Sequence, residues 1–200
     1  MTERPRVQMR GGREVILDSA VRNFTELGFH GTSMRDIARG ADVSVASIYH
    51  HFPSKQEILQ DIMLRTLRDV LALTRAAVAE AGAGTTERLD ALMTSWVLFH
   101  TTRQAEALIG ASELRSLDDD GRRQVVALRD EQERVFREIV EAGVASGEFA
   151  TTHSLEAARA VINMGYSIAS WYRPDGEASP AEMAERYRDL ALATVGHRAG

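Results

Sequence analysis

Three groups of residues in the chain have side chains that could hold a metal ion or transfer protons. They are Asp118-Asp119-Asp120, His50-His51 and His100. Consecutive carboxylates at the start of a helix point in different directions, and acidic residues there favour the helix dipole in any case. Adjacent histidines lack the spacing that brings two metal ligands to one helix face. The sequence also has no nucleophile–base–orienter set and no glycine loop for phosphates, so it predicts no enzyme, no cofactor and no metal site.

A different chemistry is indicated by the hydroxyl groups and basic side chains of residues 31–59. Ser33 can cap a short helix that ends before Gly40, a residue type that tolerates a left-handed backbone. After a tight turn, Ser44 caps a second short helix over residues 45–51. Two short helices around a tight turn are typical of a DNA-binding helix-turn-helix.

The two short helices need a larger element to pack on, because helices of this length are unstable alone. The preceding segment, Arg13 to Leu27, carries apolar residues at helical spacing on one face, and Gly28 supplies its end. Downstream, Ser54-Lys55-Gln56-Glu57 is a capping box that starts a long fourth helix. The sequence therefore predicts a three-helix DNA-binding domain over residues 1–55, with residues 1–12 as an arm.

In such a motif, residues on the first turns of the second helix reach base edges in the major groove. These positions hold Ser44, Val45, Ala46 and Ser47. Their small side chains predict hydroxyl hydrogen bonds and contacts with thymine methyl groups rather than bidentate arginine contacts. Affinity must then come largely from contacts with the phosphate backbone.

Four runs of residues carry a resemblance to a known family: residues 24–29 (FTELGF), 31–38 (GTSMRDIA), 47–52 (SIYHHF) and Ser54-Lys55. They resemble the TetR family of bacterial transcriptional regulators. The resemblance implies an all-α fold of about nine helices, in which a long helix joins the DNA-binding domain to a ligand-binding and dimerisation domain over residues 56–200. It also implies phosphate contacts by Thr32, Tyr49, His50 and Lys55. Ser33 and Arg35 are further candidate DNA-binding residues.

Some of these assignments leave an alternative open. Tyr49 could be a core aromatic residue with only its hydroxyl at the surface, and Lys55, the only lysine of the chain, could be an ordinary solvated side chain. Arg4, Arg6 and Arg10 form an arm that either enters a minor groove or stays out of it.

The composition agrees with one small and one larger helical domain, since 44% of the 200 residues are hydrophobic and 26% are charged. The net charge is −5, yet the first 55 residues hold eight Lys and Arg against six Asp and Glu, which leaves +2 there and −7 in the remainder. There are no cysteines, and no apolar stretch is long enough for an export signal or a membrane span. We expect a cytoplasmic protein without a membrane partner.

Glycine-rich and threonine-rich breaks divide the rest of the chain into helices, expected over residues 54–80, 86–103, 104–117, 118–146, 154–172 and 179–195. The last two carry small residues that allow close helix approach. A palindromic operator requires a two-fold dimer, so we expect a homodimer through these two helices, with packing inside one subunit as the alternative. The small residues are Ala157, Ala160, Gly165, Ala169, Ala184, Ala191 and Ala193.

A ligand site is expected where aromatic and polar groups lie inside apolar helices. Each such group could instead belong to the core or to a hydrogen-bonded structural pair. The candidates are Met93, Trp96, Val97 and His100 on helix 86–103, and Asn163, Met164, Ser167 and Trp171 on helix 154–172.

The run Trp171-Tyr172-Arg173-Pro174-Asp175-Gly176, with Ser179-Pro180 and Tyr187, resembles a TetR subgroup that includes repressors of steroid-ring and fatty-acid catabolism. This resemblance implies an acyl-CoA effector, with Arg173 among the arginines that would meet its phosphates. The function expected is that of a repressor which a small hydrophobic or acyl-CoA-type molecule releases from its operator. A ligand-independent architectural DNA binder and a TetR-type activator are the alternatives.

Overall fold

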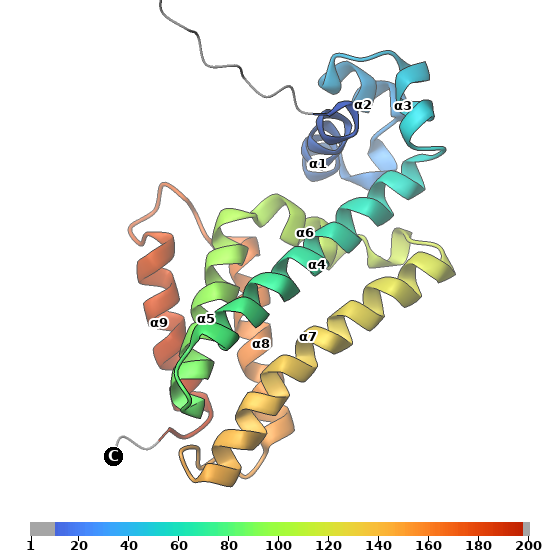
Figure 1. The fold of residues 1–200 in the computed structure, drawn as a ribbon. Coiled ribbons are helices and arrows are strands. Elements are labelled where there is room, and N and C mark those ends of the chain that lie inside the picture. The colour runs from blue at the N-terminus through green and yellow to red at the C-terminus, as the bar shows by residue number, and fades with distance from the viewer. Residues whose placement is uncertain (1–10, 198–200) are drawn as a thin grey trace, which may run out of the picture. The chain divides into compact units, whose positions relative to one another are not determined.

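The structure is a computed structural model that describes residues 11–197 (Figure 1). Over this range the chain forms nine α-helices and one short 3-10 helix, and its only β-type pairing is an isolated bridge between Phe149 and His197. The predicted all-α fold is confirmed. The helices are α1 (Gly12–Gly31), α2 (Met34–Ala41), α3 (Val45–His51), α4 (Lys55–Glu80), α5 (Thr85–Thr102), α6 (Gln104–Ser112), the 3-10 helix η1 (Leu114–Ser116), α7 (Asp119–Ser146), α8 (Ser154–Trp171) and α9 (Pro180–Thr194).

The chain divides into two compact units, one ending at Ile62 and the other beginning at Met63. The first unit contains α1, α2, α3 and the start of α4, and the second contains the rest of α4 with α5 to α9. Because α4 is one continuous helix of 26 residues, it contributes to both units. Within residues 11–197, no helix is long and apolar enough to span a bilayer.

Side-chain caps fix the starts of the two short helices in the first unit. Ser33 Oγ accepts a hydrogen bond from the backbone N–H of Asp36, and the Asp36 carboxylate accepts one from the N–H of Ser33. At the start of α3, Ser44 Oγ accepts from the N–H of Ser47. Both predicted capping serines are confirmed, and each satisfies backbone donors that a helix start leaves unpaired.

The turn between α2 and α3 differs from the prediction. The left-handed residue is Asp42, with a φ of 55°, whereas Gly40 lies inside α2. A β-carbon on Gly40 would lie 2.4 Å from Ser19 Oγ of α1. Gly40 is therefore required by the close approach of α1 and α2, while the short polar side chain of Asp42 tolerates the left-handed conformation.

The apolar faces of α1, α2 and α3 and of the start of α4 share one core. Gly28 ends the regular part of α1 as predicted, with a φ of 71°, and Phe29 then turns back into the core, where its ring centroid lies 5.4 Å from that of Phe24. The three-helix support predicted for the motif is thus present. Its most buried members include Ile16, Ala20, Phe24, Ile37, Ile48, Phe52, Ile58 and Leu59.

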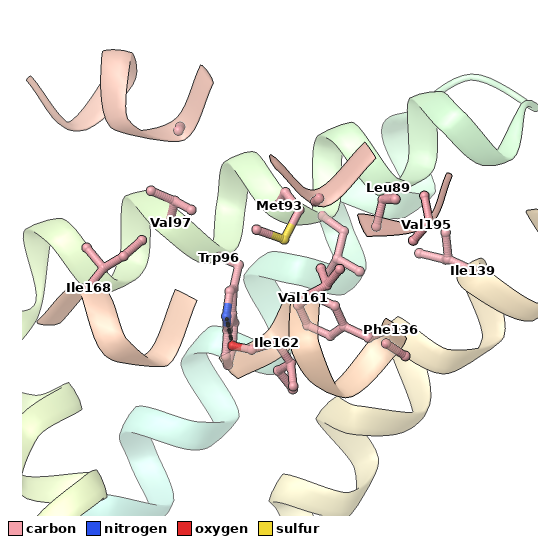
Figure 2. Packing of buried hydrophobic residues seen from close by; sticks show 14 of the residues in the cluster. Leu89, Met93, Trp96, Val97, Phe136, Ile139, Val161, Ile162, Ile168 and Val195 are labelled. Carbon is pink, nitrogen blue, oxygen red and sulfur yellow. Dashed lines mark hydrogen bonds between the residues drawn. The ribbon is translucent and has the colours of Figure 1, made fainter. Parts of the chain in front are cut away.

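In the second unit, α5 packs against α7, α8 and α9 (Figure 1). Trp96 of α5 is 0% exposed, and its Nε1–H donates to the carbonyl of Ile162 at 3.1 Å (Figure 2). A β-carbon on Gly165 would lie 2.0 Å from Cδ1 of Trp96. The helices α5 and α8 can therefore approach at this point only because residue 165 has no side chain.

Most of the small residues expected at a dimer interface are buried inside the single chain. Their small side chains serve the packing of α8 and α9 within the chain, which was the alternative to an interface role. Only Ala160 and Ala193 of the set are exposed. The buried members are Ala157, Gly165, Ala169, Ala184 and Ala191.

The predicted helix over residues 104–117 is interrupted, because α6 ends at Ser112 and η1 follows at Leu114–Ser116. The start of the last helix agrees with the prediction. Ser179 and Glu182 form a complete capping box, with Pro180 at the first helical position.

Candidate functional site

The outer side of α3 presents small side chains at the start of the helix. Ser44 and Ala46 are exposed, Val45 and Ser47 are half-buried, and Ile48 is fully buried behind them. Ser44 Oγ accepts the capping bond from Ser47 N–H, which leaves its own O–H as a donor. The helix is anchored by its inner face, so its outer face can offer hydroxyl and methyl groups to base edges.

Polar side chains flank this surface on α2 and α3. Tyr49 is 53% exposed, so it is not the core aromatic residue that was its alternative. His50, Ser33 and Arg35 are exposed as well. All four side chains are accessible to a phosphate backbone, and their contacts with it stay predictions.

The start of α2 carries a negative charge beside these groups. Hydrogen bonds from Ser33 hold the pKa of Asp36 below its usual value, so this carboxyl is ionised near neutral pH. Its Oδ1 lies 2.5 Å from a guanidinium nitrogen of Arg39. The ion pair balances a charge that would otherwise repel a phosphate at this helix end.

Two of the predicted phosphate contacts are engaged within the protein instead. Thr32 is 2% exposed, and its hydroxyl donates to the carbonyls of Asn23 and Gly28. Lys55 Nζ donates to the carbonyls of Phe29 and Thr32 at 2.6 and 2.5 Å. Without DNA, the side chains of Thr32 and Lys55 therefore bond within the turn between α1 and α2, and their contacts with phosphates stay predictions.

Other predicted groups fall outside this surface. Arg4, Arg6 and Arg10 lie outside the described residues. Asp118 caps α7 by accepting from the N–H of Gly121 at 2.7 Å, as expected for an acid at a helix start. Among residues 11–197, no group of three or more His, Asp or Glu residues is arranged to hold a metal ion.

In the second unit, a small cavity of about 30 Å³ lies beside a cluster of aromatic rings. The ring centroid of His100 is 4.3 Å from that of Trp96 and 5.4 Å from that of Tyr166. His100 Nδ1 lies 2.8 Å from the Trp96 carbonyl oxygen, so Nδ1 carries the proton and Nε2 is an acceptor. Burial lowers the pKa of His100 to about 4, which keeps the ring neutral at physiological pH.

An open groove of about 470 Å³ adjoins this cavity and shares Ala111, Arg129 and Tyr166 with it. One guanidinium nitrogen of Arg129 donates to the carbonyl of Gly110 at 2.5 Å, while its Nε is buried without a partner among the described residues. Burial also raises the pKa of Tyr166, so its hydroxyl stays protonated. The junction of the two spaces thus offers the donors of Arg129 and Tyr166 to an acceptor group, and the acidic residues Asp130 and Glu133 line the same groove.

The predicted ligand residues divide among different environments. Trp96 and His100 line the cavity, and Asn163 lines the groove. Met93 and Val97 are 0% exposed in the core, where Met93 lies beside Trp96 (Figure 2). The remaining four line neither space: Met164 is half-buried, and Ser167, Trp171 and Arg173 are exposed.

Arg129 and Tyr166 were missed from the sequence. Tyr166 lies on the same predicted helix as Asn163 and Met164, so its aromatic ring in an apolar helix was a usable signal. Arg129 stands among many charged residues of α7, and nothing in the sequence separates it from the exposed ones.

Two family models match the chain. Residues 16–62 match the bacterial regulatory proteins of the tetR family, and residues 82–195 match the tetracyclin repressor-like C-terminal domain. The first match covers α2, α3 and most of α1 as well as the start of α4, and the second covers α5 to α9. The second match alone spans more than half of the chain.

Curated relatives and solved structures agree with these matches. The HTH-type transcriptional repressor KstR2 of Rhodococcus jostii is 30% identical over 184 residues, which are 91% of this chain and 90% of that protein. A tetR-family regulatory protein from Rhodococcus RHA1 has a TM-score of 0.88 at 30% identity, over 95% of this chain and 100% of that one.

A crystal structure of AibR in complex with isovaleryl coenzyme A and operator DNA has a TM-score of 0.83, over 94% of this chain and all of that one. Its identity of 23% makes this a likeness of fold alone. The curated relatives are transcriptional repressors and not enzymes, in agreement with the prediction of a non-catalytic protein. With both domains matched and a relative at 30% identity along most of its length, the chain belongs to the TetR family of bacterial transcriptional regulators.

Proposed function

We propose that the protein is a repressor that binds a palindromic DNA operator as a homodimer and is released from it by a small-molecule effector. The observation that carries this proposal is the outer face of α3, where accessible hydroxyl and methyl groups stand on a buried and capped helix. Ser44, Val45, Ala46 and Ser47 would read base edges. Such a regulator acts on the bacterial chromosome, so its place is the cytoplasm.

The backbone contacts proposed are those of Ser33, Arg35, Tyr49 and His50, whose side chains are accessible around α3. Contacts of this kind fix the register of a helix on the duplex but carry little sequence information. One copy of α3 offers few specific contacts, so selective binding calls for two copies on two half-sites.

We place the dimer interface on α8 and α9, on their exposed apolar side chains rather than on the buried small ones. Leu190 is 50% and Trp171 is 48% exposed. The ring of Trp171 stacks on that of Tyr187 at 6.3 Å, which extends the apolar surface from one helix to the other. Burial of such side chains is a typical source of homodimer stability.

The effector proposed is an apolar molecule with an acceptor or anionic group, and acyl-CoA thioesters are our first candidates. Arg129 Nε and the Tyr166 hydroxyl would receive the acceptor or anion, and the aromatic cluster at Trp96 and His100 would receive the apolar part. The fold shared with AibR, whose crystal structure contains isovaleryl coenzyme A, supports this class.

Binding at the cavity gives a route to regulation. A space of about 30 Å³ holds only about one or two water molecules, so an organic ligand must push its walls apart. One wall is formed by α4 through Met63, Thr66, Leu67 and Val70. Displacement of α4 would shift the population toward a dimer geometry with lower operator affinity.

The operator proposal is tested first by selecting duplexes from a random-sequence library with the full-length protein. The affinity for the enriched duplex is then measured against that for a scrambled competitor over a range of salt concentrations. We expect an enriched palindrome and a large specificity ratio. Binding that ignores sequence would favour the architectural alternative, and stimulated rather than reduced transcription in vitro would favour the activator.

The effector proposal is tested by thermal shift and by operator release with short-chain, long-chain and steroid acyl-CoAs. A true effector raises the unfolding temperature of the free protein and lowers operator affinity. Free CoA serves as the control for binding through the nucleotide alone. No stabilisation by any of the thioesters would remove this effector class.

A further inference from the structure

We propose that Lys55 is a positioning residue, an internal clamp that holds the start of α4 to the turn between α1 and α2. This inference rests on the proposed operator binding. Lys55 Nζ lies 2.6 Å from the carbonyl oxygen of Phe29 and 2.5 Å from that of Thr32, and 4.4 Å from the centre of the Phe29 ring. Three separate contacts therefore hold one half-buried ammonium group.

The two carbonyls stand at a junction of the first unit. Phe29 follows Gly28, where the backbone leaves helical geometry, and Thr32 is the C-cap of α1 and directly precedes Ser33, the N-cap of α2. Carbonyls at a helix end have no partner within the helix and carry partial negative charge. A cation there satisfies them, and it fixes the direction in which the chain enters α2.

The same contacts oppose a role as a phosphate ligand. An ammonium group has three N–H donors, and two of them already bond with the carbonyls of Phe29 and Thr32. To reach a phosphate, Lys55 would have to give up two charge-assisted hydrogen bonds, and the Phe29 carbonyl would keep only the long hydrogen bond from the N–H of Thr32 at 3.4 Å. It would also leave the face of the Phe29 ring.

Lys55 is the first residue of α4, so the clamp has a mechanical consequence. It ties the helix that lines the effector cavity to the point at which α2 begins. A displacement of the start of α4 would carry the α1–α2 turn with it, so the clamp would transmit the effector signal to the operator-binding surface.

The first test uses the fact that Lys55 is the only lysine of the chain. The native protein is treated with a limiting amount of an amine-acetylating reagent, and the Lys55 and N-terminal peptides are quantified separately by mass spectrometry. We expect Lys55 in the folded protein to react at least about tenfold more slowly than in urea, and operator DNA to change that rate less than twofold. If Lys55 in the folded protein is acetylated fast and operator DNA slows that reaction, the proposed clamp is wrong and a phosphate contact is supported.

The second test compares Lys55→Met, which removes the ammonium group, with Lys55→Arg, which keeps charged donors. At a temperature where each variant is folded by circular dichroism, we expect Lys55→Met to lower operator affinity about tenfold or more and Lys55→Arg to recover most of it. Lost phosphate contacts would reduce the slope of log affinity against log salt by roughly 1.8 for two subunits, at about 0.9 for each phosphate. The clamp predicts a much smaller change of slope.

If folded Lys55→Met binds the operator with wild-type affinity, Lys55 has only a stability role and the inference is overturned. A fall of roughly 1.8 in the slope of log affinity against log salt would overturn it as well. Failure of the proposed function is a separate outcome, because the wild-type protein would then show no sequence-specific binding. The acetylation rate of the free protein tests the clamp even in that case.

Discussion

Adding one methyl group at Gly165 tests whether the approach of α8 to α5 depends on a missing side chain. The β-carbon of an alanine there would lie 2.0 Å from Cδ1 and 2.2 Å from Nε1 of Trp96. The indole is 0% exposed and its Nε1 donates to the Ile162 carbonyl, so a shift of the ring would break that hydrogen bond. Gly165→Ala must therefore push the helices apart or break that hydrogen bond.

The expected cost can be assembled from three contributions. Overpacking a filled core costs roughly 1–3 kcal/mol, and contacts this short place Gly165→Ala at the upper end. Loss of the Trp96–Ile162 hydrogen bond adds about 1 kcal/mol, while replacing glycine by alanine in a helix returns about 1 kcal/mol. The net loss is roughly 3 kcal/mol, which corresponds to a fall in Tm of roughly 6–12 °C for a chain of this size.

The assay is thermal unfolding followed by tryptophan fluorescence in a Trp171→Phe background, which leaves Trp96 as the only tryptophan. Gly110→Ala is the matched control, because Gly110 also lies in a helix but has nothing within 4 Å of the added β-carbon. Its Tm should be unchanged or raised. Equal stability of the Gly165→Ala and Gly110→Ala proteins would refute the packing argument.

The remaining predictions concern titration, operator contact and effector binding. Hydrogen bonds from the start of α5 lower the pKa of Glu148 from 4.5 to about 2. The stabilisation that Glu148 contributes is therefore present above pH 4.5 and is lost as the pH falls toward 2. Glu148→Gln should flatten the pH dependence of urea unfolding between these values, and an unchanged curve would contradict this. Burial lowers the pKa of His100 from 6.5 to about 4, so stability should fall as the pH drops from 6.5 to 4, and His100→Phe should remove this dependence if the protein stays folded. Tyr49→Ala should weaken operator affinity several-fold while Tm and sedimentation stay unchanged; equal affinity would exclude Tyr49 as a DNA contact. Arg129→Leu should abolish the increase in Tm caused by any active acyl-CoA without lowering operator affinity. An increase equal to that of the wild-type protein would show that the anionic group of the effector does not bind at Arg129.

The helices and their ends were largely predictable because their signals are local. The capping serines Ser33, Ser44 and Ser179 act on backbone groups within three residues, so the sequence alone contains the whole interaction. Gly28 is a local signal as well, because glycine readily adopts the positive φ that ends a helix. The exception, Gly40, was misassigned because its requirement comes from Ser19 on another helix.

The residues of the candidate ligand site were harder to predict, because helical spacing gives the face of a helix but not what lies opposite. Met93 and Val97 share a helix with His100, yet they pack into the core while His100 lines a cavity. Arg129 lies in the site, where one of its guanidinium nitrogens donates to the carbonyl of Gly110 on α6, 19 residues away along the chain.

By itself, the sequence determined the helical architecture, the family and the outward face of α3, since caps, turn residues and apolar periodicity act over a few residues. Only the tertiary structure decided which contacts individual side chains make. The sequence and the family resemblance assign Lys55 to a DNA phosphate, whereas in the structure its Nζ bonds with the carbonyls of Phe29 and Thr32, which lie 26 and 23 residues away along the chain. Such long-range pairs depend on how helices pack, and that depends on every side chain between them.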